Sequence, residues 1–231
     1  MKPLAGRVAV VTGASRGIGA AIAAALVESG ATVVRLARSL ADGEDGPYFN
    51  LTTDLTDAVL LKRATDEVLA EFGPPHIVVN NAGGFLLRLF EETTPEEFEE
   101  QLAINLVAPF NLTRALLPAM RSAGRGHLVT IGSIADHLAL PENAAYAASK
   151  YGLRGLHETL VAEYRGIGIK FTLISPGPTD TELWNEFDPD RRAGFTPRAR
   201  MLKPGDVADA VNYAITRPAN VTVELIRLGP A

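Results

Sequence analysis

Short apolar segments alternate with longer segments of helical periodicity along the whole chain. The apolar segments are rich in β-branched residues and span residues 8–11, 32–36, 77–79, 128–131, 171–174 and 221–228. The segments with helical spacing span residues 19–29, 56–72, 94–120, 143–165 and 206–216. Nearly continuous apolar strands that alternate with helices are typical of a parallel sheet covered on both faces.

Right-handed crossovers between such strands produce a doubly wound fold. We therefore predict one α/β domain of the Rossmann type over residues 1–231, with a parallel sheet of about seven strands and helices on both faces. Thr94, Pro95 and Glu97 predict a helix start, because they form a capping box with proline at the first helical position. Asp206 is expected to cap the last helix.

Residues 179–204 follow neither period, although they contain Trp184, Phe187 and arginines at 191, 192, 198 and 200. A long irregular segment within a compact domain is often functional. We predict a substrate-binding loop or lid here, and the alternative is a plain surface excursion. The arginines either lie on a solvated lid or contact an acidic substrate or the phosphates of a cofactor.

Composition excludes several classes of protein. The chain has 231 residues, with 22 Lys and Arg against 27 Asp and Glu, a formal net charge of −5. A mildly acidic chain lacks the basic footprint of a nucleic-acid-binding protein. With no cysteine it has no disulfide framework or thiolate metal site. The four histidines, at 76, 127, 137 and 157, show no metal-ligand spacing, so no metal is expected.

The sequence also carries expectations about location. No signal peptide precedes the first apolar segment, and no apolar run reaches the roughly 18 residues of a membrane span. We expect a cytoplasmic protein that does not enter a membrane.

A glycine-rich turn, TGASRGIG at residues 12–19, joins the first apolar segment to an alanine-rich helix. Glycines let the backbone turn tightly and approach a pyrophosphate, and the helix that follows presents free N–H groups to it. Strand, glycine-rich turn and helix in this order predict a dinucleotide site.

The end of the second apolar segment predicts which dinucleotide. Users of NAD carry an acid about 20 residues further on for the ribose 2′-hydroxyl, whereas Arg suits a 2′-phosphate. Here Arg38 and Ser39 follow the strand, and Arg16 lies in the glycine-rich turn. Two guanidiniums can clamp a phosphate dianion, so NADP(H) is favoured over NAD(H). The alternative is that Arg38 is solvated and that an acid, Asp42 or Glu44, serves NAD.

Ser133 follows the fourth apolar segment, and Tyr146 and Lys150 lie in the next predicted helix. Residues four apart share one face of a helix, so a phenol lies beside an ammonium. With these residues the sequence resembles the short-chain dehydrogenase/reductase family over nearly its whole length. The motifs are TGxxxGIG at 12–19, Asp54-Leu55, NNAG at 80–83, Asn105, Ser133, Tyr146-x-x-x-Lys150 and Pro176-Gly177 followed by Thr181.

The residue types explain the chemistry that the resemblance implies. A neighbouring ammonium lowers the pKa of a phenol, so Tyr146 is expected to act as the acid in carbonyl reduction and the base in alcohol oxidation. Ser133 can donate a hydrogen bond to the substrate oxygen. By the resemblance, Lys150 also holds the nicotinamide ribose, and Asn105 helps to hold a water beside Lys150. Taken singly, Tyr146, Ser133 and Asn105 also fit ordinary structural roles.

The remaining family matches concern the cofactor. The expected cofactor-binding residues are Gly13, Ser15, Arg16, Gly17, Ile18, Gly19, Arg38, Ser39, Asp54, Leu55, Asn81, Ala82, Gly83, Ile131, Tyr146, Lys150, Pro176, Gly177, Thr179 and Thr181.

The substrate is expected to be a small carbonyl compound or alcohol, for instance a 3-oxo or 3-hydroxy acyl or acid compound, or a small ketone or aldehyde. Its pocket is expected to involve Phe85, Leu86, Leu138, Leu140, Trp184 and Phe187. His137 either lines this pocket or has a structural role. The sequence after the last strand lacks the Gly-Gly segment that many members of the family have. In this respect it resembles the branch that contains the 3-hydroxy acid dehydrogenases.

Members of the family are mostly tetramers or dimers, so a homo-oligomer is expected, a tetramer before a dimer. The competing interpretation of function is a non-catalytic NADP(H)-binding regulatory protein. The intact set of Asn105, Ser133, Tyr146 and Lys150 favours the enzyme. A third interpretation, a serine hydrolase, would need G-x-S-x-G as a nucleophile elbow. The spacing occurs at residues 13–17, within the glycine-rich turn that predicts the dinucleotide site, so the hydrolase is not favoured.

Overall fold

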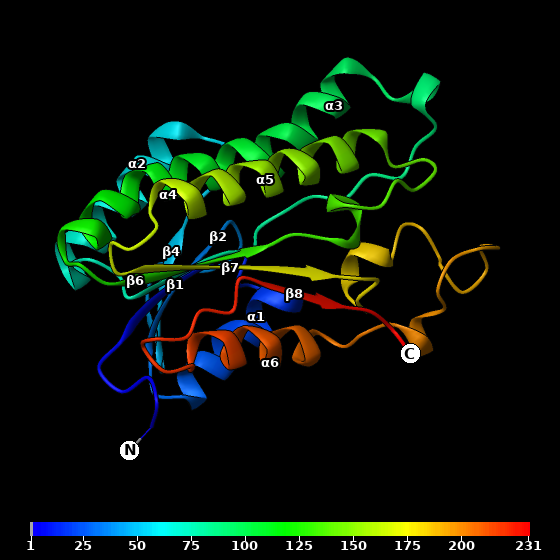
Figure 1. Ribbon diagram of the computed structural model, residues 1–231. Helices are drawn as coiled ribbons and strands as arrows, with labels where there is room; N and C mark the ends of the chain where they lie inside the picture. The colour runs from blue at the N-terminus through cyan, green and yellow to red at the C-terminus, as the bar shows by residue number, and fades with distance from the viewer. Residues whose placement is uncertain (1) are drawn as a thin grey trace.

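The computed structural model describes residues 2–231. It consists of one mostly parallel sheet between two layers of helices (Figure 1). The strands are β1 Val8–Thr12, β2 Thr32–Ala37, β3 Gly43–Asp45, β4 Tyr48–Thr52, β5 Ile77–Asn80, β6 Gly126–Ile131, β7 Ile169–Pro176 and β8 Leu225–Leu228. The helices are α1 Gly17–Glu28, α2 Ala58–Phe72, α3 Pro95–Leu102, α4 Ala108–Ser122, α5 Ala144–Glu163 and α6 Pro204–Ile215. Met1 of the predicted domain lies outside the described residues.

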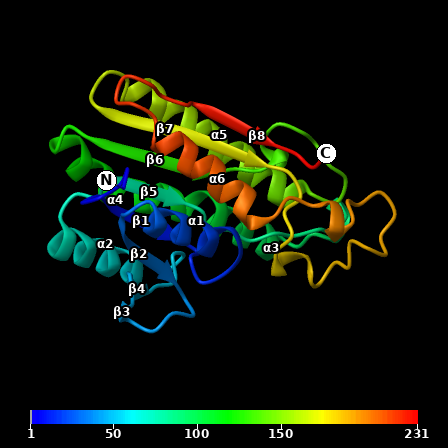
Figure 2. The same cartoon turned by 90° about the horizontal axis from the view of Figure 1, so that it is seen from below.

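The strand order β3-β4-β2-β1-β5-β6-β7-β8 confirms the doubly wound fold (Figure 2). Every neighbouring pair is parallel except β3 with β4. The sheet therefore has eight strands rather than about seven, because the short antiparallel β3 adds an edge. The sequence pattern missed β4 as well, since polar Asn50 interrupts its apolar run and accepts a hydrogen bond from Arg35 Nε at 2.8 Å.

Period-two alternation along the strands builds both cores. In β1, Ala9 and Val11 face the layer of α1 and α6, whereas Val10 faces the layer of α2, α4 and α5. Val10 pairs in register with Val34 of β2 and Val78 of β5, which lie in the same core. Figure 1 shows α2, α4 and α5 on one side of the sheet and α1 and α6 on the other. The prediction of a sheet covered on both faces is thus confirmed.

The helix ends agree with the sequence except at the last helix. Thr94 Oγ1 accepts from the Glu97 N–H at 3.2 Å, and the Glu97 carboxylate accepts from the Thr94 N–H at 3.0 Å. The predicted capping box is present. Asp206, however, does not precede α6: it is the third residue of the helix and accepts from the Lys203 N–H at 2.7 Å. Proline at 204 starts the helix earlier, because its fixed φ suits the first turn.

The segment predicted as one helix over 94–120 is α3 and α4 joined by a π-helical turn, Ala103–Val107. The combined helix, Pro95–Ser122, is long and apolar enough by length and composition to cross a membrane, whereas the sequence was expected to contain no such segment. The core helix of a globular domain has the same character, and this helix buries Leu112, Leu116 and Met120 of its own α4 part in the core.

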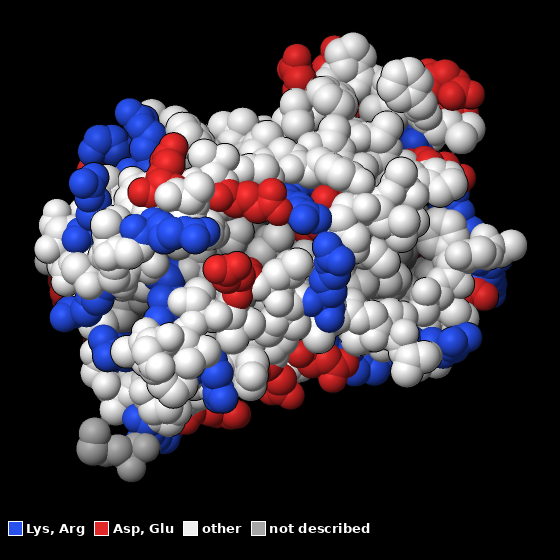
Figure 3. Space-filling model, viewed as in Figure 1, with Lys and Arg blue, Asp and Glu red and all other residues white. Residues whose placement is uncertain are grey.

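Charged side chains are mixed on the surface. On the face shown in Figure 3, basic side chains lie mainly toward the left end, and acidic side chains lie among them and along the lower edge.

Candidate active site

A cleft of about 1340 Å³ opens at the carboxyl ends of the parallel strands. The order of successive strands changes direction between β1 and β5, and such a switch point is where doubly wound sheets bind ligands. Each catalytic or cofactor-binding residue expected from the sequence lines this one cleft. The cleft also includes residues that the sequence did not suggest, among them Gln101, Glu142 and Asn143.

The glycine-rich turn lies against the start of the next crossover at this switch point. A side chain at Gly19 would collide with the carbonyl oxygen of Gly13, so only glycine fits there. Thr12 Oγ1 accepts from the N–H groups of Asn81 and Ala82 at 2.9 and 3.0 Å. Asn81 Nδ2 donates to the Thr12 carbonyl at 2.9 Å. These bonds fasten the turn to the NNAG segment and keep both along one edge of the cleft.

The far end of the cleft is lined by Arg38 and not by the two acids, Asp42 and Glu44, that could serve NAD. Arg38 and Ser39 are exposed and line the cleft, whereas Asp42 and Glu44 are not among its lining residues. Asp42 accepts hydrogen bonds from the Thr52 backbone and so closes its own loop. No ion pair engages Arg38 within residues 2–231, although its charge contributes to the lowered pKa of Asp54.

Asp54, which follows β4, also borders this end of the cleft. Its Oδ1 accepts from the N–H and Oγ1 of Thr56 at 2.9 and 2.7 Å. These two hydrogen bonds, with the side-chain bond the stronger influence, lower the pKa of Asp54 below its usual value. The carboxylate is held in one orientation and stays charged.

Arg16 differs from Arg38 because it already has a partner. Its Nη1 lies 2.9 Å from Glu182 Oε2, in the loop after β7. Both side chains are more than half exposed, so the ion pair is weak and a phosphate can compete for Arg16.

Ser133 stands at the carboxyl end of β6 and caps a short 3-10 helix, Ile134–Asp136. Its Oγ accepts from the Ala135 N–H at 3.2 Å. Because Oγ accepts from the backbone, its own hydrogen can be donated, and a hydrogen bond with Tyr146 uses it in this structure. The structural role of a cap and a role in the cleft are thus compatible for Ser133.

Tyr146 and Lys150 lie in the first two turns of α5 and face the same wall of the cleft as Ser133. Lys150 Nζ donates to the Ile131 carbonyl at 3.1 Å and lies 5.7 Å from the centre of the Tyr146 ring. The expectation that Lys150 lowers the pKa of Tyr146 is not met in the free protein. Desolvation raises the pKa of Tyr146 to about 12, although a hydrogen bond with Ser133 acts in the opposite direction.

Desolvation acts on Lys150 as well and lowers its pKa to about 8. The sign follows from the charges, because burial disfavours both the phenolate and the ammonium. Without a ligand the phenol is protonated at neutral pH, and Lys150 loses its proton just above it.

Asn105 is fully buried in the π-helical turn Ala103–Val107. Its Oδ1 accepts from the Gly84 N–H at 3.1 Å, and its Nδ2 donates to the Gly84 carbonyl at 3.1 Å. A single π turn inside an α-helix frequently marks a functional position. The turn brings Asn105 into the cleft beside the segment that follows β5.

Comparison with known proteins agrees with this site. Residues 7–192 match the family described as short chain dehydrogenase. This chain belongs to the short-chain dehydrogenase family. It is 37% identical over 223 residues to D-threitol dehydrogenase of Mycolicibacterium smegmatis, covering 91% of this chain and 86% of the relative. It is 34% identical over 233 residues to 3-oxoacyl-[acyl-carrier-protein] reductase of Escherichia coli, covering 96% of each chain.

Solved structures of short-chain dehydrogenases share the fold. A metagenomic short-chain oxidoreductase in complex with NADP superposes with a TM-score of 0.82 at 33% identity, covering 99% of both chains. The aldohexose dehydrogenase of Thermoplasma acidophilum has a TM-score of 0.87 at 25% identity, covering 99% of this chain and 94% of that one. The family is one of oxidoreductases that act on alcohols and carbonyls.

An aromatic wall closes the cleft of this short-chain dehydrogenase beside Tyr146. The Phe85 ring meets the rings of Tyr146, Trp184 and Phe187 at centroid distances of 4.9, 5.1 and 5.3 Å. Trp184 in turn packs on Phe195 at 6.2 Å. Residues 179–204 thus pack against the segment after β5 through aromatic contacts.

Two residues expected in the substrate pocket, Leu86 and Leu138, lie elsewhere, and so does His137, for which both roles were open. Leu86, Leu138 and His137 are not among the residues that line the cleft, and Leu138 is exposed. His137 Nδ1 lies 2.6 Å from Asp136 Oδ1, which agrees with the structural role. Phe187 contributes as support for Phe85 rather than as lining. Phe85, Leu140 and Trp184 do line the cleft.

The arginines of residues 179–204 are occupied by groups of the chain itself. Arg192 pairs with Glu142, and Arg198 Nη1 lies 2.9 Å from Asp180 Oδ1. Arg191 pairs with Asp188, and Arg200 Nη2 donates to the Ala231 carbonyl at 3.4 Å. These contacts fasten the segment and favour the structural interpretation over an anion site.

Histidine accounts for no metal site. Among residues 2–231 no group of three or more His, Cys, Asp or Glu residues is placed to hold a metal ion. His127 is buried and shares a 2.7 Å hydrogen bond with Thr172 Oγ1, while His76 Nδ1 accepts from the Val8 N–H at 3.2 Å.

Proposed function

We propose that the protein is an NADP(H)-dependent oxidoreductase that interconverts a carbonyl compound and the corresponding secondary alcohol, with Tyr146 as the acid or base. The observation that carries this proposal is the convergence of Ser133, Tyr146, Lys150 and Asn105 on one cleft with the glycine-rich turn.

The side chains divide the work at the reacting carbonyl. The hydroxyl of Ser133, which hydrogen-bonds with Tyr146, can turn its hydrogen to the substrate oxygen, where negative charge develops. Tyr146 is protonated at neutral pH, which suits it to deliver a proton to the same oxygen. Lys150 is the adjacent cation that stabilises the resulting phenolate. Asn105, held by Gly84, positions a water that can return a proton through Lys150. The bound nicotinamide supplies or accepts the hydride.

The cleft fits a dinucleotide. Glycine at position 19 lets the start of α1 pack against the Gly13 carbonyl, and the first N–H groups of α1 can then bind a pyrophosphate. We assign the adenosine 2′-phosphate to Arg38, which has no partner, with Arg16 as a second contact that must leave Glu182. Asp54 and Leu55 would meet the adenine, Asn81, Ala82, Gly83 and Ile131 the ribose, and Pro176, Gly177, Thr179 and Thr181 the nicotinamide. Two solved neighbours, the metagenomic enzyme and the alcohol dehydrogenase of Thermococcus sibiricus, hold NADP and 5-hydroxy-NADP.

The substrate proposed is a 3-oxo or 3-hydroxy acyl or acid compound, or a small ketone or aldehyde. The relatives support a carbonyl or alcohol group in the substrate without choosing among these. Residues 179–204 are proposed as the substrate-binding lid, because Trp184 and Phe195 belong both to that segment and to the cleft.

The first test is a titration of the purified protein with NADPH and NADH, followed by nicotinamide fluorescence. We expect NADPH to bind more tightly, because Arg38 contributes a charge-assisted contact to its extra phosphate. A panel of ketones, aldehydes and 3-oxo compounds with NADPH is then expected to show turnover. Tight binding without turnover on a broad panel would favour the regulatory alternative. Absence of binding by either cofactor would refute the assignment of the glycine-rich turn.

A homo-oligomer is also proposed, a tetramer before a dimer, together with a cytoplasmic location. Three large, mainly apolar side chains are exposed: Val107 on the π turn between α3 and α4, Phe110 on α4 and Tyr151 on α5. Burial of such side chains favours association by roughly 25 cal/mol per Å². Light scattering of the purified protein is expected to give a multiple of the 24.6 kDa chain mass. A mass near that of one chain would refute the oligomer.

A further inference from the structure

A buried carboxylate, Asp136, lies directly behind Ser133 and has no part in the function proposed above. We propose that Asp136 is a positioning residue of this active site, which fixes the backbone of Ser133 and whose negative charge stabilises the Lys150 ammonium. This inference rests on the proposed function for its meaning in catalysis, whereas its effect on Lys150 can be measured without turnover.

Asp136 is held by donors from three directions. It is 1% exposed. Its Oδ2 accepts from the Ser133 N–H at 3.2 Å and from Ser175 Oγ, on β7, at 2.5 Å. Its Oδ1 accepts from His137 Nδ1 at 2.6 Å. These hydrogen bonds connect the short helix after β6 to the neighbouring strand β7.

The chain also makes room for this carboxylate. A side chain on Gly132 would collide with Asp136 Oδ2, so the residue before Ser133 has to be glycine for the carboxylate to reach the Ser133 N–H. A carboxylate that touches the backbone of the serine at the end of β6 limits where the serine hydroxyl can point.

Two basic side chains lie near Asp136. From its own short helix His137 contacts it, and from α5 Arg154 Nη1 approaches Oδ1 to 3.8 Å. Arg154 is shared, because its Nε also pairs with Glu158 at 2.7 Å. The other titratable groups that face Asp136 from α5 are Tyr146 and Lys150. Ser175, from β7, is neutral.

The field of Asp136 reaches both groups that handle the proton. Desolvation lowers the pKa of Lys150 to about 8, and the charge of Asp136 opposes that fall. The same charge is a smaller cause of the raised pKa of Tyr146. Without Asp136 both groups are expected to lose their protons at lower pH. The ammonium beside Tyr146 would then be depleted in the neutral range, where carbonyl reduction needs it.

The test compares the wild-type protein with Asp136→Asn, which keeps the shape of the side chain and removes its charge. In protein labelled at the lysine Cε, ¹³C NMR follows the titration of Lys150, assigned by its loss in Lys150→Arg. We expect a wild-type midpoint near the pKa of about 8 and a lower midpoint in Asp136→Asn. Ser175→Ala is the matched control, because it removes one donor to Asp136 and leaves the charge; its midpoint is expected to be unchanged.

Kinetics supply the second measurement. In Asp136→Asn, kcat for carbonyl reduction at neutral pH is expected to fall by about tenfold, with its alkaline limb moved to lower pH, while NADPH affinity changes little. If Asp136→Asn does not fold, Asp136→Ser serves, since it is smaller and retains an acceptor oxygen. A Lys150 midpoint equal to the wild-type value in the folded variant would overturn the inference. Absence of wild-type turnover would instead overturn the proposed function and leave the NMR result standing.

Discussion

Replacing Tyr146 with phenylalanine is expected to reduce kcat for carbonyl reduction by on the order of 10²–10⁴-fold, to the point of no measurable turnover, and to leave NADPH binding unchanged. The substitution removes one hydroxyl and nothing else. The ring still meets Phe85 edge-on, as it does at 4.9 Å in the native protein, so the aromatic wall persists. What is lost is the proton donor that desolvation keeps protonated, with a pKa raised to about 12.

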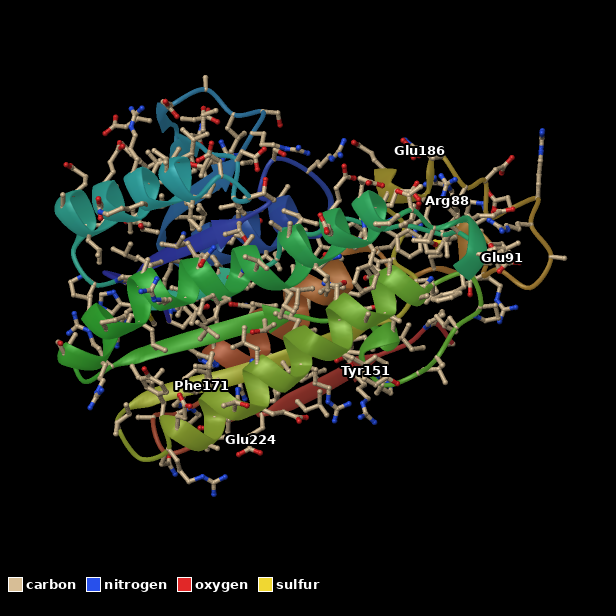
Figure 4. The ribbon with its side chains drawn as sticks, turned by 90° about the horizontal axis from the view of Figure 1, so that it is seen from above. Arg88, Glu91, Tyr151, Phe171, Glu186 and Glu224 are labelled. Carbon is tan, nitrogen blue, oxygen red and sulfur yellow. The ribbon has the colours of Figure 1, made fainter. Side chains whose placement is uncertain are left out.

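Tyr151→Phe provides a matched control for this experiment. Tyr151 is on the same helix, α5, but is 47% exposed and does not line the cleft (Figure 4). Its variant is expected to retain wild-type kinetics. Steady-state rates with a saturating cofactor, together with NADPH titrations, distinguish catalysis from binding. Activity of Tyr146→Phe near the wild-type level would reject Tyr146 as the acid.

Replacing Arg38 with aspartate is expected to weaken NADPH binding by about 10- to 100-fold and to leave NADH binding equal or tighter. A hydrogen-bonded contact to a charged group contributes about 1.5–3 kcal/mol, which corresponds to that range of affinity. Arg38 has no competing ion pair, so the native contact is formed without breaking another. The new carboxylate repels a 2′-phosphate and can accept from a ribose 2′-hydroxyl.

The control for that variant is Arg63→Asp, which makes the same change of charge on the exposed face of α2, away from the cleft. It separates the local contact from the effect of net charge on a polyanionic cofactor. Ratios of NADPH to NADH dissociation constants, measured at one salt concentration, are expected to shift only for Arg38→Asp. An unchanged ratio in Arg38→Asp would show that Arg38 does not choose between the cofactors.

The elements that sequence predicted best are those in which local pattern and burial agree. The apolar runs of β1 and β5 form strands because both of their faces are buried, and the capping box at Thr94 forms within four residues. β4 was missed since its polar Asn50 is satisfied only by Arg35, a residue of the neighbouring strand. The segment predicted as a strand over 221–228 is shorter, Leu225–Leu228, because only that part pairs with β7.

The candidate site divides in the same way. Motif order placed the serine, tyrosine, lysine and asparagine in one cleft, as the structure does. The pKa of Tyr146 was expected to be lowered, whereas desolvation raises it. A spacing of four residues indicates that an ammonium is near but not that both groups are desolvated. No motif in the sequence distinguishes Asp136 from the other acidic residues among the 27 Asp and Glu.

The sequence by itself determined the doubly wound fold, the family and the list of residues around the cleft, because strand period, glycine-rich turn and motif order are local properties of the chain. Only the tertiary structure decided which charges meet. It gave Arg16 a partner in Glu182 and left Arg38 without one, turned His137 toward Asp136, and buried Tyr146 and Lys150 together. The physical reason is that desolvation and charge pairing depend on distances between segments far apart in sequence, which no local pattern encodes.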